Sequence, residues 1–567
     1  MCGIAGIVGE KSNKKILTKM LASQNHRGPD NTGIYGDNEV MLGHNRLSII
    51  DLTKNANQPF TDVNKRYYLT FNGEIYNYLE LRSELNYCFK TDSDTEVLLA
   101  AYLKWGKDCL HKLNGMFSFA IWDSEKKKLF AARDRFGVKP FYYCLYEKDF
   151  YFSSEIKALF ETGIIKKPNK KVWANYFSYG SYGLPHETFW KDIHQLSAGH
   201  YIEYEKNNLK ISKWYFFEEE IRKYSTQNLS YQESKEKYTK LLKDSIKLRF
   251  RADVSIGFNI SGGVDSSTLL ALINNEKSTK NIKAFTFYCD NKEYDELPWV
   301  EEMISHTNNP LEKVLLKSND VKKLSAKISD LQDEPYGGIP TVAYANIFKK
   351  ARNLNTIVLL DGQGMDEQWA GYDYYLSNNN TNTIQGVVNS PFKKNVLTKE
   401  FLKYADKPTY PKPFSDDLLN KQYRDLFYTK IPRALRFNDR ISMAFSTELR
   451  EPFLDYRLVE FAFSQPLEYK IKNNVQKKMI RDIASEYLSN SISYAPKRPL
   501  QTPQREWLQN ELFDFVLNKL KTLKDSEYSS WFNFSEIEKE LKLYKECELD
   551  SSFHIWQWLN LSLLINK

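Results

Sequence analysis

The hydrophobic pattern changes partway along the chain, and this change limits the folds that the chain can adopt. Up to about residue 205, short stretches alternate apolar and polar residues, as in YYLTFNGEIYN (67–77) and DFYFSSE (149–155). Such alternation is typical of antiparallel strands with one buried face. After residue 231, the apolar strands DVSIGFNI (253–260), KAFTFYC (283–289) and NTIVLLDG (355–362) alternate with helical stretches. That second pattern is typical of a parallel, doubly wound α/β sheet.

The two patterns predict two domains. We expect an α+β domain in residues 1–205 and an α/β domain, with a mostly helical C-terminal part, in residues 231–567. Residues 206–230 are polar, and we expect them to form an irregular linker. A chain of 567 residues is long enough for two or three domains with complete cores.

Composition excludes several classes of protein. The net charge of +8 is spread thinly along the chain. The sequence has no dense Lys/Arg block interleaved with aromatic residues, so we expect no nucleic-acid binding. The six cysteines form no CxxC pair, which is typical of reduced thiols in the cytoplasm. No apolar run reaches about 18 residues, so we expect no membrane-spanning helix. The first residues also lack the order of a signal peptide, and we expect a cytoplasmic protein.

Cys2 is the first candidate for chemistry. Removal of Met1 would give Cys2 a free α-amine beside its thiol, and an amine with a pKa near 8 can act as the base for that thiol. The thiolate is the form that attacks an amide carbonyl. The alternative is that a cysteine stands at position 2 by chance.

The residues around and after Cys2 favour the chemical interpretation. GIAGIVG follows directly, and further motifs are HRGPD (26–30), GHNRLSIID (43–51), FNGEIYN (71–77), TDSDTEV (91–97), LNGMFSFAIWD (113–123) and ARDRFGVKPFYY (132–143). In order and spacing, this series resembles the glutaminase domain of class II glutamine amidotransferases. The resemblance implies an N-terminal-nucleophile (Ntn) sandwich fold with Cys2 as the nucleophile.

The same resemblance implies a glutamine pocket. Arg46 would hold the α-carboxylate of glutamine and Asp94 its α-ammonium, while the backbone of Gly73 and Glu74 would line the pocket. The Asn72 side-chain amide and the Gly73 backbone N–H would form the oxyanion hole. Taken alone, the dipeptide Asn72-Gly73 is equally typical of a type I′ hairpin turn.

A second candidate site is the turn SGGVDSS (261–267), between an apolar strand and an apolar helix. Gly262 and Gly263 let backbone N–H groups face a phosphate at the positive end of the helix. Asp265 can bind Mg²⁺, and the remaining candidate phosphate donors are Ser261, Ser266 and Ser267. The chain has no GxxxxGK[ST] motif, and an ordinary turn with a helix cap is the alternative.

SGGxDS after a strand resembles the pyrophosphate loop of the PP-loop ATPases, which cleave ATP between its α and β phosphates. FTFYCDNKEYDE (285–296) and LLDGQGMDEQWAGY (359–372) are similar to the asparagine synthetases within that group. The resemblance implies that Phe287 packs against adenine and that the backbone of Asp361 and Gly362 lies near the nucleotide. Asp366 would then be the second Mg²⁺ ligand, beside Asp265.

Later motifs extend the resemblance almost to the end of the chain. DRISMAFSTELREPFLDYRLVEFA (439–462) and APKRPLQTPQREWL (495–508) are similar to the same family. Lys497 falls where the family has a lysine that acts on the adenylate. Gln363 stands where asparagine synthetases usually carry an acidic residue, and Asp361 replaces a common serine.

The two resemblances together imply one coupled reaction. Glutamine would release ammonia at Cys2, ATP would activate a carboxylate, and ammonia would travel through an internal passage to form the amide, AMP and pyrophosphate. Aspartate is the expected acceptor, and a uronic-acid sugar of a surface polysaccharide is the alternative because of Gln363. An inactive regulatory relative and a glutaminase that supplies a partner are further alternatives. Family members are often homodimers.

Overall fold

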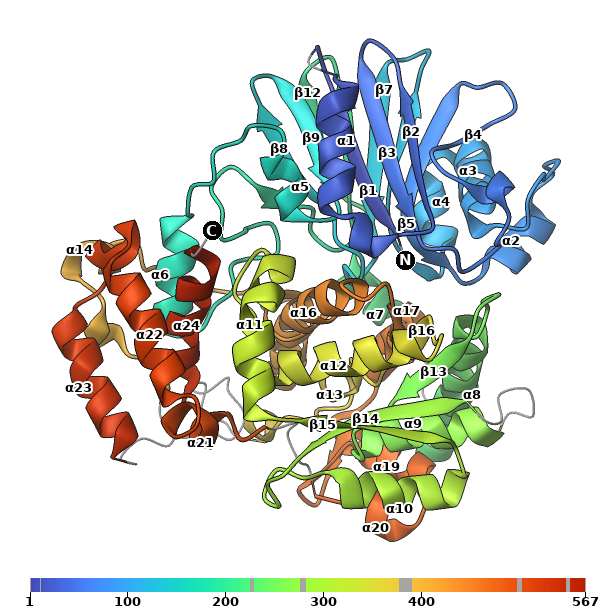
Figure 1. Cartoon of the computed structure of the whole chain (residues 1–567). Coiled ribbons are helices and arrows are strands. Elements are labelled where there is room, and N and C mark those ends of the chain that lie inside the picture. Colours follow the sequence, from blue (N-terminus) through green and yellow to red (C-terminus); the bar gives the residue numbers. More distant parts are fainter. Residues whose placement is uncertain are drawn as a thin grey trace.

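The computed structural model describes residues 2–10, 12–224, 229–275, 282–376, 390–496, 502–546 and 551–565. The N-terminal part is a sandwich of two antiparallel sheets, and the C-terminal part is a parallel sheet covered by helices (Figure 1). The α+β Ntn sandwich followed by an α/β PP-loop domain with a helical C-terminal part is therefore confirmed as the fold class. Within the described residues, no helix is both long and apolar enough to cross a bilayer.

The two N-terminal sheets pack face to face. The first has the order β10-β8-β9-β1-β3-β2, from β1 (Gly3–Val8), β2 (Asn31–Gly36), β3 (Val40–Arg46), β8 (Tyr142–Tyr146), β9 (Asp149–Ser153) and β10 (His194–Gln195). The second has the order β12-β11-β7-β6-β5-β4, from β4 (Phe60–Thr61), β5 (Tyr67–Ile75), β6 (Gly115–Asp123), β7 (Lys128–Arg133), β11 (His200–Glu205) and β12 (Asn208–Lys213). Ile4, Leu42 and Trp122 belong to the core between the sheets, because inward residues alternate along each strand.

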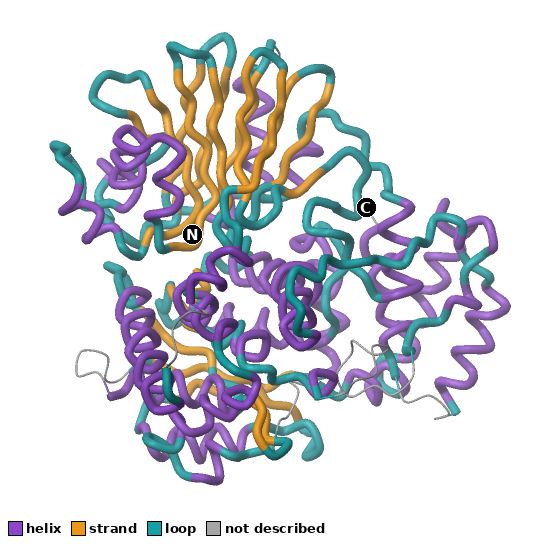
Figure 2. Tube along the Cα trace, turned by 180° about the vertical axis from the view of Figure 1, so that it is seen from behind, coloured by secondary structure: helices purple, strands orange, loops and turns teal. Residues whose placement is uncertain are grey.

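Helices cover the outer faces of this sandwich. They are α1 (Lys14–Ser23), α2 (Tyr78–Glu84), α3 (Asp94–Trp105), α4 (Cys109–Lys112) and α5 (Ile156–Phe160). Two further helices, α6 (Lys170–Tyr179) and α7 (Phe217–Tyr224), pack on helices of the C-terminal part. Helices α1 and α5 pack on the first sheet and α3 on the second. The tube view shows the strands of the sandwich side by side, above the helices of the second part (Figure 2).

The segment 206–230 is more ordered than the sequence predicts. Strand β12 pairs with β11 along its length, and helix α7 follows it before residues 225–228, which are outside the described residues. Residues 208–213 are largely polar because they form an edge strand whose residues are exposed or half-buried. The expectation of an irregular linker is therefore corrected for these residues.

The C-terminal part is built on a parallel sheet with the order β15-β14-β13-β16-β17. Its strands are β13 (Ile256–Asn259), β14 (Lys283–Cys289), β15 (Leu311–Leu316), β16 (Val358–Leu360) and β17 (Glu448–Arg450), and β18 (Ile471–Lys472) and β19 (Val475–Gln476) form a separate hairpin. The chain leaves β13 toward β14 and β15, and then returns to the other side of β13 to form β16 and β17. The strand order therefore reverses between β13 and β16, where doubly wound sheets bind ligands.

The helices of this part form two groups. Those around the sheet are α8 (Tyr231–Arg249), α9 (Val264–Asn275), α10 (Leu297–Thr307), α11 (Ser318–Gln332), α12 (Ile339–Asn353), α13 (Met365–Gln368), α15 (Asp417–Arg424), α16 (Ile431–Met443), α17 (Tyr456–Ser464), α18 (Leu467–Lys470), α19 (Lys478–Ala484) and α20 (Asn490–Ser493). A lateral group consists of α14 (Lys399–Leu402), α21 (Gln504–Gln509), α22 (Phe513–Lys524), α23 (Phe534–Lys545) and α24 (Phe553–Ile565). The lateral group packs beside α6 of the N-terminal part (Figure 1).

Candidate active sites

Cys2 lies just before β1, at the end of the sandwich that faces the second part of the molecule (Figure 1). Its backbone N–H donates a hydrogen bond to Asn72 Oδ1 at 3.0 Å, and its Sγ lies 3.9 Å from the carbonyl oxygen of Leu47. Arg27 Nε donates to the Cys2 carbonyl oxygen at 3.0 Å. Contacts from three separate segments thus fix the backbone and the thiol of Cys2.

Asn72 and Gly73 lie within β5, paired with Ser118 and Phe117 of β6, and not in a hairpin turn. The Asn72 Nδ2 atom is buried and has no hydrogen-bond partner among the described residues. A Cβ atom on Gly73, whose φ is +153°, would lie 2.1 Å from the Met116 carbonyl oxygen. The strand therefore requires glycine at 73, and the Asn72 amide keeps a donor beside Cys2.

Arg46 ends β3 and is 5% exposed. Its guanidinium donates to the Thr53 carbonyl oxygen at 2.7 Å, to Asn57 Oδ1 at 2.8 Å and to the Asp51 carbonyl oxygen. These contacts fix the direction of the cation. Burial raises the pKa of the Cys2 thiol, and the Arg46 charge acts in the opposite direction.

Asp94 begins α3 and accepts a hydrogen bond from the Ile75 backbone N–H at 2.9 Å. Burial raises the pKa of Asp94 to about 7. Glu74 is also buried, and burial, together with the nearby Glu448 and Asp94 carboxylates, raises its pKa. The sequence-predicted residues of the first site are therefore brought together at one end of the sandwich, with an anionic side and the cation Arg46.

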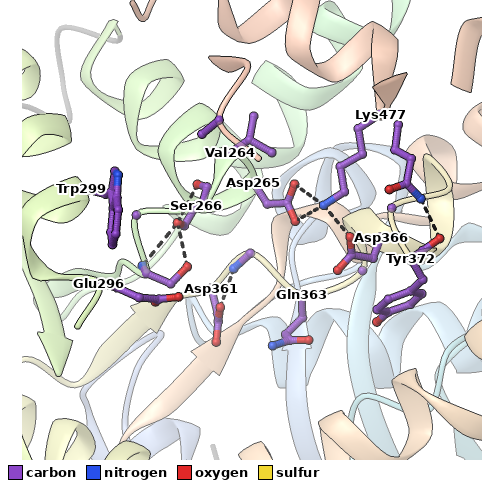
Figure 3. A pocket seen from close by; sticks show the side chains of 18 of the residues that line it. Val264, Asp265, Ser266, Glu296, Trp299, Asp361, Gln363, Asp366, Tyr372 and Lys477 are labelled. Carbon is purple, nitrogen blue, oxygen red and sulfur yellow. Dashed lines mark hydrogen bonds and ion pairs between the residues drawn. The ribbon is translucent and has the colours of Figure 1, made fainter. Parts of the chain in front are cut away.

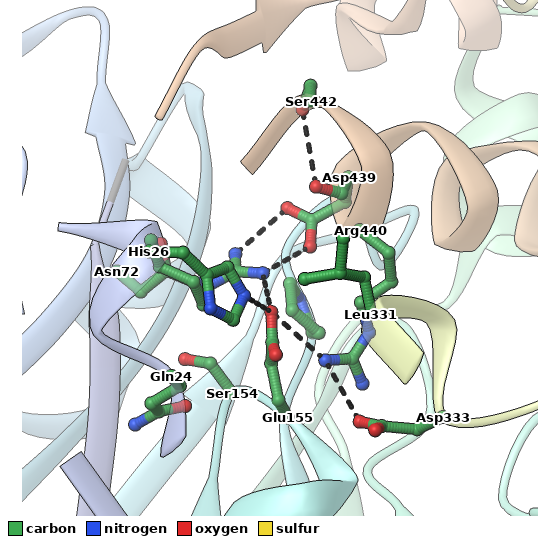
Figure 4. A network of polar contacts seen from close by, with 12 residues as sticks. Gln24, His26, Asn72, Ser154, Glu155, Leu331, Asp333, Asp439, Arg440 and Ser442 are labelled. Atoms are coloured by element: carbon green, nitrogen blue, oxygen red, sulfur yellow. Dashed lines mark hydrogen bonds and ion pairs between the residues drawn. The ribbon is translucent and has the colours of Figure 1, made fainter. Parts of the chain in front are cut away.

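An ion-pair network joins this site to the second part of the molecule (Figure 4). Arg27 is fully buried and donates to both carboxylate oxygens of Asp439 on α16, at 2.9 and 3.1 Å. The same guanidinium donates to Glu155 at 3.0 Å, and Arg440 lies 3.3 Å from that carboxylate. The residue that binds the Cys2 carbonyl is thus held by a helix of the C-terminal part.

The second site is a pocket at the carboxyl ends of β13 and β16, where the strand order reverses (Figure 3). Its wall comes from the turn after β13, the loop after β16, helices α10 and α12 and the segment around α19. The lining residues include Asn259, Ser261, Gly262, Gly263, Asp265, Ser266, Glu296, Trp299, Tyr344, Asp361, Gly362, Gln363, Asp366, Glu367, Tyr372, Gln476, Lys477, Arg481, Ala495 and Pro496.

The turn SGGVDSS has the shape of an anion-binding loop. The Ser261 backbone N–H donates to Ser266 Oγ at 3.3 Å, which folds the turn over the start of α9. Gly262 has a φ of +70°, a conformation that L side chains rarely adopt. The first turn of α9 directs backbone N–H groups and a positive dipole toward the pocket, as a phosphate site requires.

Lys477 joins the two predicted metal-binding carboxylates. Its Nζ lies 2.8 and 2.6 Å from the two carboxylate oxygens of Asp265 and 2.5 Å from Asp366 Oδ1. Although burial acts in the opposite direction, the two carboxylates raise the pKa of Lys477. A Cβ on Gly371 would lie 1.9 Å from Asp366 Oδ1 and 2.2 Å from Lys477 Cε. Glycine at 371 therefore permits this close arrangement.

Not every sequence-predicted residue lines this pocket. Ser267 is fully buried in α9, and Phe287 belongs to the hydrophobic core, with its ring 6.4 Å from that of Tyr344. Tyr344 lines the pocket in its place. Lys497 is outside the described residues, although Ala495 and Pro496 just before it line the pocket.

The sequence interpretation missed several pocket residues, and Lys477 is the foremost. Lys477 adopts a left-handed conformation with a φ of 56°, which aims its side chain between Asp265 and Asp366. Residues 476–484 (QKKMIRDIA), which are also similar to the asparagine synthetases, contain Lys477, but neither spacing nor residue type distinguishes it from Lys478. Glu367, which accepts a hydrogen bond from the Tyr372 hydroxyl at 2.7 Å, was missed for the same reason.

Two family models together match most of the chain. Residues 1–215 match a glutamine amidotransferase domain, and residues 237–566 match asparagine synthase. These ranges agree with the sandwich and with the part built on the parallel sheet.

Individual relatives are similar over most of the length. A glutamine-hydrolyzing asparagine synthetase of Bacillus subtilis is 30% identical over 88% of this chain and 86% of its own. A second one from that organism is 28% identical over 98% and 95%. A putative glutamine-hydrolyzing asparagine synthetase of Methanocaldococcus jannaschii is 35% identical over 66% and 76%. With the two sites described above, these matches show that the chain belongs to the asparagine synthetase family of glutamine-dependent, ATP-using amidotransferase ligases.

Proposed function

We propose that this enzyme makes asparagine from aspartate, using ammonia from glutamine and the energy of ATP. The observation that carries the proposal is the presence, in one chain, of the Cys2–Asn72 site and the pocket between β13 and β16. The products would be asparagine, glutamate, AMP and pyrophosphate. A cytoplasmic location and a homodimer remain predictions.

The first half-reaction is assigned to the Cys2 site. The Cys2 thiolate attacks the side-chain amide of glutamine, and the Asn72 Nδ2 donor and the Gly73 N–H stabilise the oxyanion. The unpartnered Asn72 Nδ2 supports this role, since such a donor contributes about 10²–10³ in rate. Arg46 and Asp94 hold the two charged ends of glutamine, and the backbone of Gly73 and Glu74 lines the pocket.

The second half-reaction is assigned to the SGGVDSS pocket. The loop 261–267 and the start of α9 bind the phosphates, and the Asp361–Gly362 backbone lies beside the nucleotide. Trp299 and Tyr344 supply the apolar wall for the adenine in place of Phe287, which is in the core. Lys497 is assigned to the adenylate, as the resemblance implies.

The pocket is suited to Mg²⁺ with ATP. The described lining residues include more carboxylates than cations: Asp265, Glu296, Asp361, Asp366 and Glu367, against Lys477 and Arg481. A polyphosphate in this setting needs added positive charge, and carboxylate and phosphate oxygens are the ligands that Mg²⁺ prefers. Asp265 and Asp366 would hold the ion, which would neutralise phosphate charge when bound.

The acceptor is the part of the proposal that depends most on one residue. Gln363 lines the pocket but carries no charge, so it can neither accept a proton nor pair with the α-ammonium of aspartate. A uronic-acid sugar, which has a carboxylate and no ammonium, is the second candidate for this reason.

Pyrophosphate release with ATP, Mg²⁺ and glutamine, measured with and without L-aspartate, tests the proposal. Aspartate-dependent release with formation of asparagine is the expected result. No response to aspartate, with glutaminase activity intact, would move the assignment to a uronic acid. Absence of both activities would favour an inactive relative.

The Cys2→Ala variant tests the division of labour between the sites. It should lose glutamine-dependent synthesis and keep synthesis from added ammonia, because the ATP pocket contains no part of Cys2. Loss of both activities in a folded variant would contradict two separate half-sites.

A further inference from the structure

Amide formation from ammonia leaves one proton to be removed, and the carboxylates of the ATP pocket differ in their readiness to accept it. Asp265 and Asp366 are both paired with the Lys477 ammonium. Glu367 accepts a hydrogen bond from the Tyr372 hydroxyl, and burial and the adjacent Asp366 raise its pKa to about 7, but it stands directly beside a carboxylate proposed to hold Mg²⁺. Asp361 has different surroundings.

Asp361 follows β16 directly and lines the pocket. Its two carboxylate oxygens accept hydrogen bonds from neutral groups, the Gly362 backbone N–H at 2.6 Å and Asn259 Nδ2 at 3.3 Å. Tyr344 on α12 is a further neutral neighbour, whose pKa burial and Asp361 raise. Burial raises the pKa of Asp361 to about 6, so the carboxylate is ionised at neutral pH and still basic enough to take a proton.

Glu451 is the acidic neighbour of Asp361. Leu360 of β16 pairs in parallel with Arg450 of β17, so the residues that follow them, Asp361 and Glu451, lie side by side at the carboxyl ends of the two strands. The Asp361 N–H continues the pairing, with a hydrogen bond of 2.9 Å to the Arg450 carbonyl oxygen. Glu451 Oε2 is buried and has no hydrogen-bond partner among the described residues.

The charges that face Glu451 come from both parts of the molecule. Burial raises the pKa of Glu451 to about 8; Lys139 of the sandwich and Arg249 of α8 act against this shift, and Asp361 and Asp439 add to it. The pKa of Glu451 is therefore higher than that of Asp361, and Asp361 is the more ionised of the two at neutral pH. Two adjacent carboxyl groups whose surroundings separate their pKa values are typical of acid–base sites.

Glu451 is also influenced by the contact between the two parts of the molecule. Asp439, whose charge adds to the raised pKa of Glu451, is the carboxylate that binds Arg27, and Arg27 binds the Cys2 carbonyl oxygen.

We propose that Asp361, with Glu451 beside it, accepts the proton that the ammonia nitrogen loses during amide formation. Ammonia attacks the acyl adenylate, the C–N bond forms, one N–H proton passes to the Asp361 carboxylate, and the C–O bond to AMP breaks. Asp361 returns the proton to solvent when the products leave. This inference rests on the proposed function, and it gives the Asp361 side chain a role beyond the backbone contact with ATP.

The neutral Gln363 fits this assignment. An amide side chain cannot accept a proton, so the loop 361–366 needs a basic carboxylate elsewhere. Asp361 lies two residues earlier in the same loop and lines the same pocket. The loop therefore carries a carboxylate at position 361 and an amide at position 363, and the two positions can be tested by moving the carboxylate from one to the other.

The test compares two half-reactions in the full-length enzyme with Asp361→Asn, which keeps the size of the side chain. Ammonia-dependent amide formation should fall about 100-fold, since general-base catalysis contributes about 10²–10⁴, and ATP–pyrophosphate exchange should fall far less. At a constant concentration of unprotonated ammonia, the wild-type rate should rise with pH through about 6, and the variant should lose this rise. Asp525→Asn, the same change at an exposed site, is the matched control.

The double variant Asp361→Ser/Gln363→Glu provides a rescue arm. It returns a carboxylate to the loop at position 363, and it should recover at least tenfold of the amide formation lost in Asp361→Asn. Equal losses of exchange and amide formation, or an unchanged pH profile in Asp361→Asn, would overturn the assignment.

An infrared titration supplies a test that needs no acceptor. In the difference between the wild-type and Asp361→Asn titrations, the C=O stretch of a protonated carboxyl group should grow as the pH falls from 7 to 5. A second such band, already present at pH 7, should appear in the difference between the wild type and Glu451→Gln. Absence of the first difference band would overturn the inference, whereas absence of aspartate-dependent exchange in the wild type would overturn the proposed acceptor.

Discussion

Lys477 shows how much of the ATP pocket depends on a single side chain. Its ammonium lies within 2.8 Å of oxygens of both Asp265 and Asp366, and it is 4% exposed. Without it, two carboxylates would face each other in a largely buried pocket, where like charges repel strongly.

Lys477→Met should therefore abolish ATP–pyrophosphate exchange, with a loss of at least about 100-fold. The methionine keeps most of the apolar stem and removes the charge, so the pocket loses its bridge between Asp265 and Asp366. Glutaminase activity at Cys2 should stay close to the wild-type value. Lys478→Met is the matched control, because the neighbouring Lys478 contacts Asp482 and not the pocket. Exchange that survives in Lys477→Met would contradict this role.

Gly73 provides a second prediction at this scale. Gly73→Ala would place a Cβ 2.1 Å from the Met116 carbonyl oxygen, so β5 and β6 would have to separate beside Cys2. Glutaminase activity should fall at least about 100-fold through displacement of the oxyanion donors. Ammonia-dependent synthesis should persist, as measured by pyrophosphate release.

Gly163→Ala is the control for Gly73→Ala. Gly163 also has a positive φ, of 95°, but no atom lies within 4 Å of its added Cβ. If both variants lose glutaminase activity equally, backbone strain and not the contact with Met116 would be the cause.

Residue type and motif spacing predicted which side chains gather at each site, and their chemical roles stay predictions. Cys2 lies beside Asn72, and residues of the turn 261–267 line the pocket. Contacts that depend on a backbone conformation could not be predicted in this way. The left-handed φ of Lys477 and the withdrawal of Phe287 into the core arise from packing between segments distant in sequence.

At the scale of elements, helix α24 contains a buried ionisable group away from both sites. His554 is 1% exposed, and neither ring nitrogen has a hydrogen-bond partner among the described residues. Its ring lies against Trp558 at 5.2 Å and Tyr544 at 6.1 Å. Burial lowers the pKa of His554 to about 3.

The enzyme should therefore lose stability below the ordinary histidine pKa of about 6.5. Because the folded state binds its proton only near pH 3, the contribution of His554 is complete above pH 6.5 and falls by about 1.4 kcal/mol per pH unit below it. His554→Phe should raise the Tm at pH 5 more than at pH 8. Equal shifts at the two pH values, measured by calorimetry, would contradict a neutral buried histidine.

In the C-terminal part, the sequence predicted strands only where the apolar run was long. The runs 253–260, 283–289 and 355–362 contain β13, β14 and β16, whereas β15 and β17 were missed. Strand β17 has only three residues, and two of them are the charged Glu448 and Arg450. These two side chains pair with each other at 2.5 Å inside the protein, so their burial could not be inferred from hydrophobicity.

At the scale of the whole molecule, buried ion pairs hold the two parts together. Asp439 of α16 accepts two hydrogen bonds from the Arg27 guanidinium, and Glu155 accepts a third. Removal of one partner leaves an uncompensated buried charge, at a cost of about 3–5 kcal/mol.

Asp439→Asn should therefore lower the Tm and lower glutaminase activity together, because Arg27 also binds the Cys2 carbonyl oxygen. Calorimetry and a glutaminase assay on the full chain measure the two effects. Glu220→Gln removes an exposed pair with Lys223 and should change neither. A lower Tm with unchanged glutaminase activity would show that the network supports the fold without positioning Cys2.

The ion pair between Arg450 and Glu74 has a consequence for the engineering of chimaeras. Arg450 Nη2 reaches 3.5 Å from Glu74 Oε2, so a strand of the parallel sheet supplies a counter-charge for Glu74 of the sandwich. The N-terminal sandwich and the C-terminal part are therefore joined by specific contacts as well as by the connecting chain. A glutaminase domain transplanted onto another synthetase would need the recipient to carry an arginine at the same position, and swaps should succeed in proportion to how well recipient strands reproduce β17.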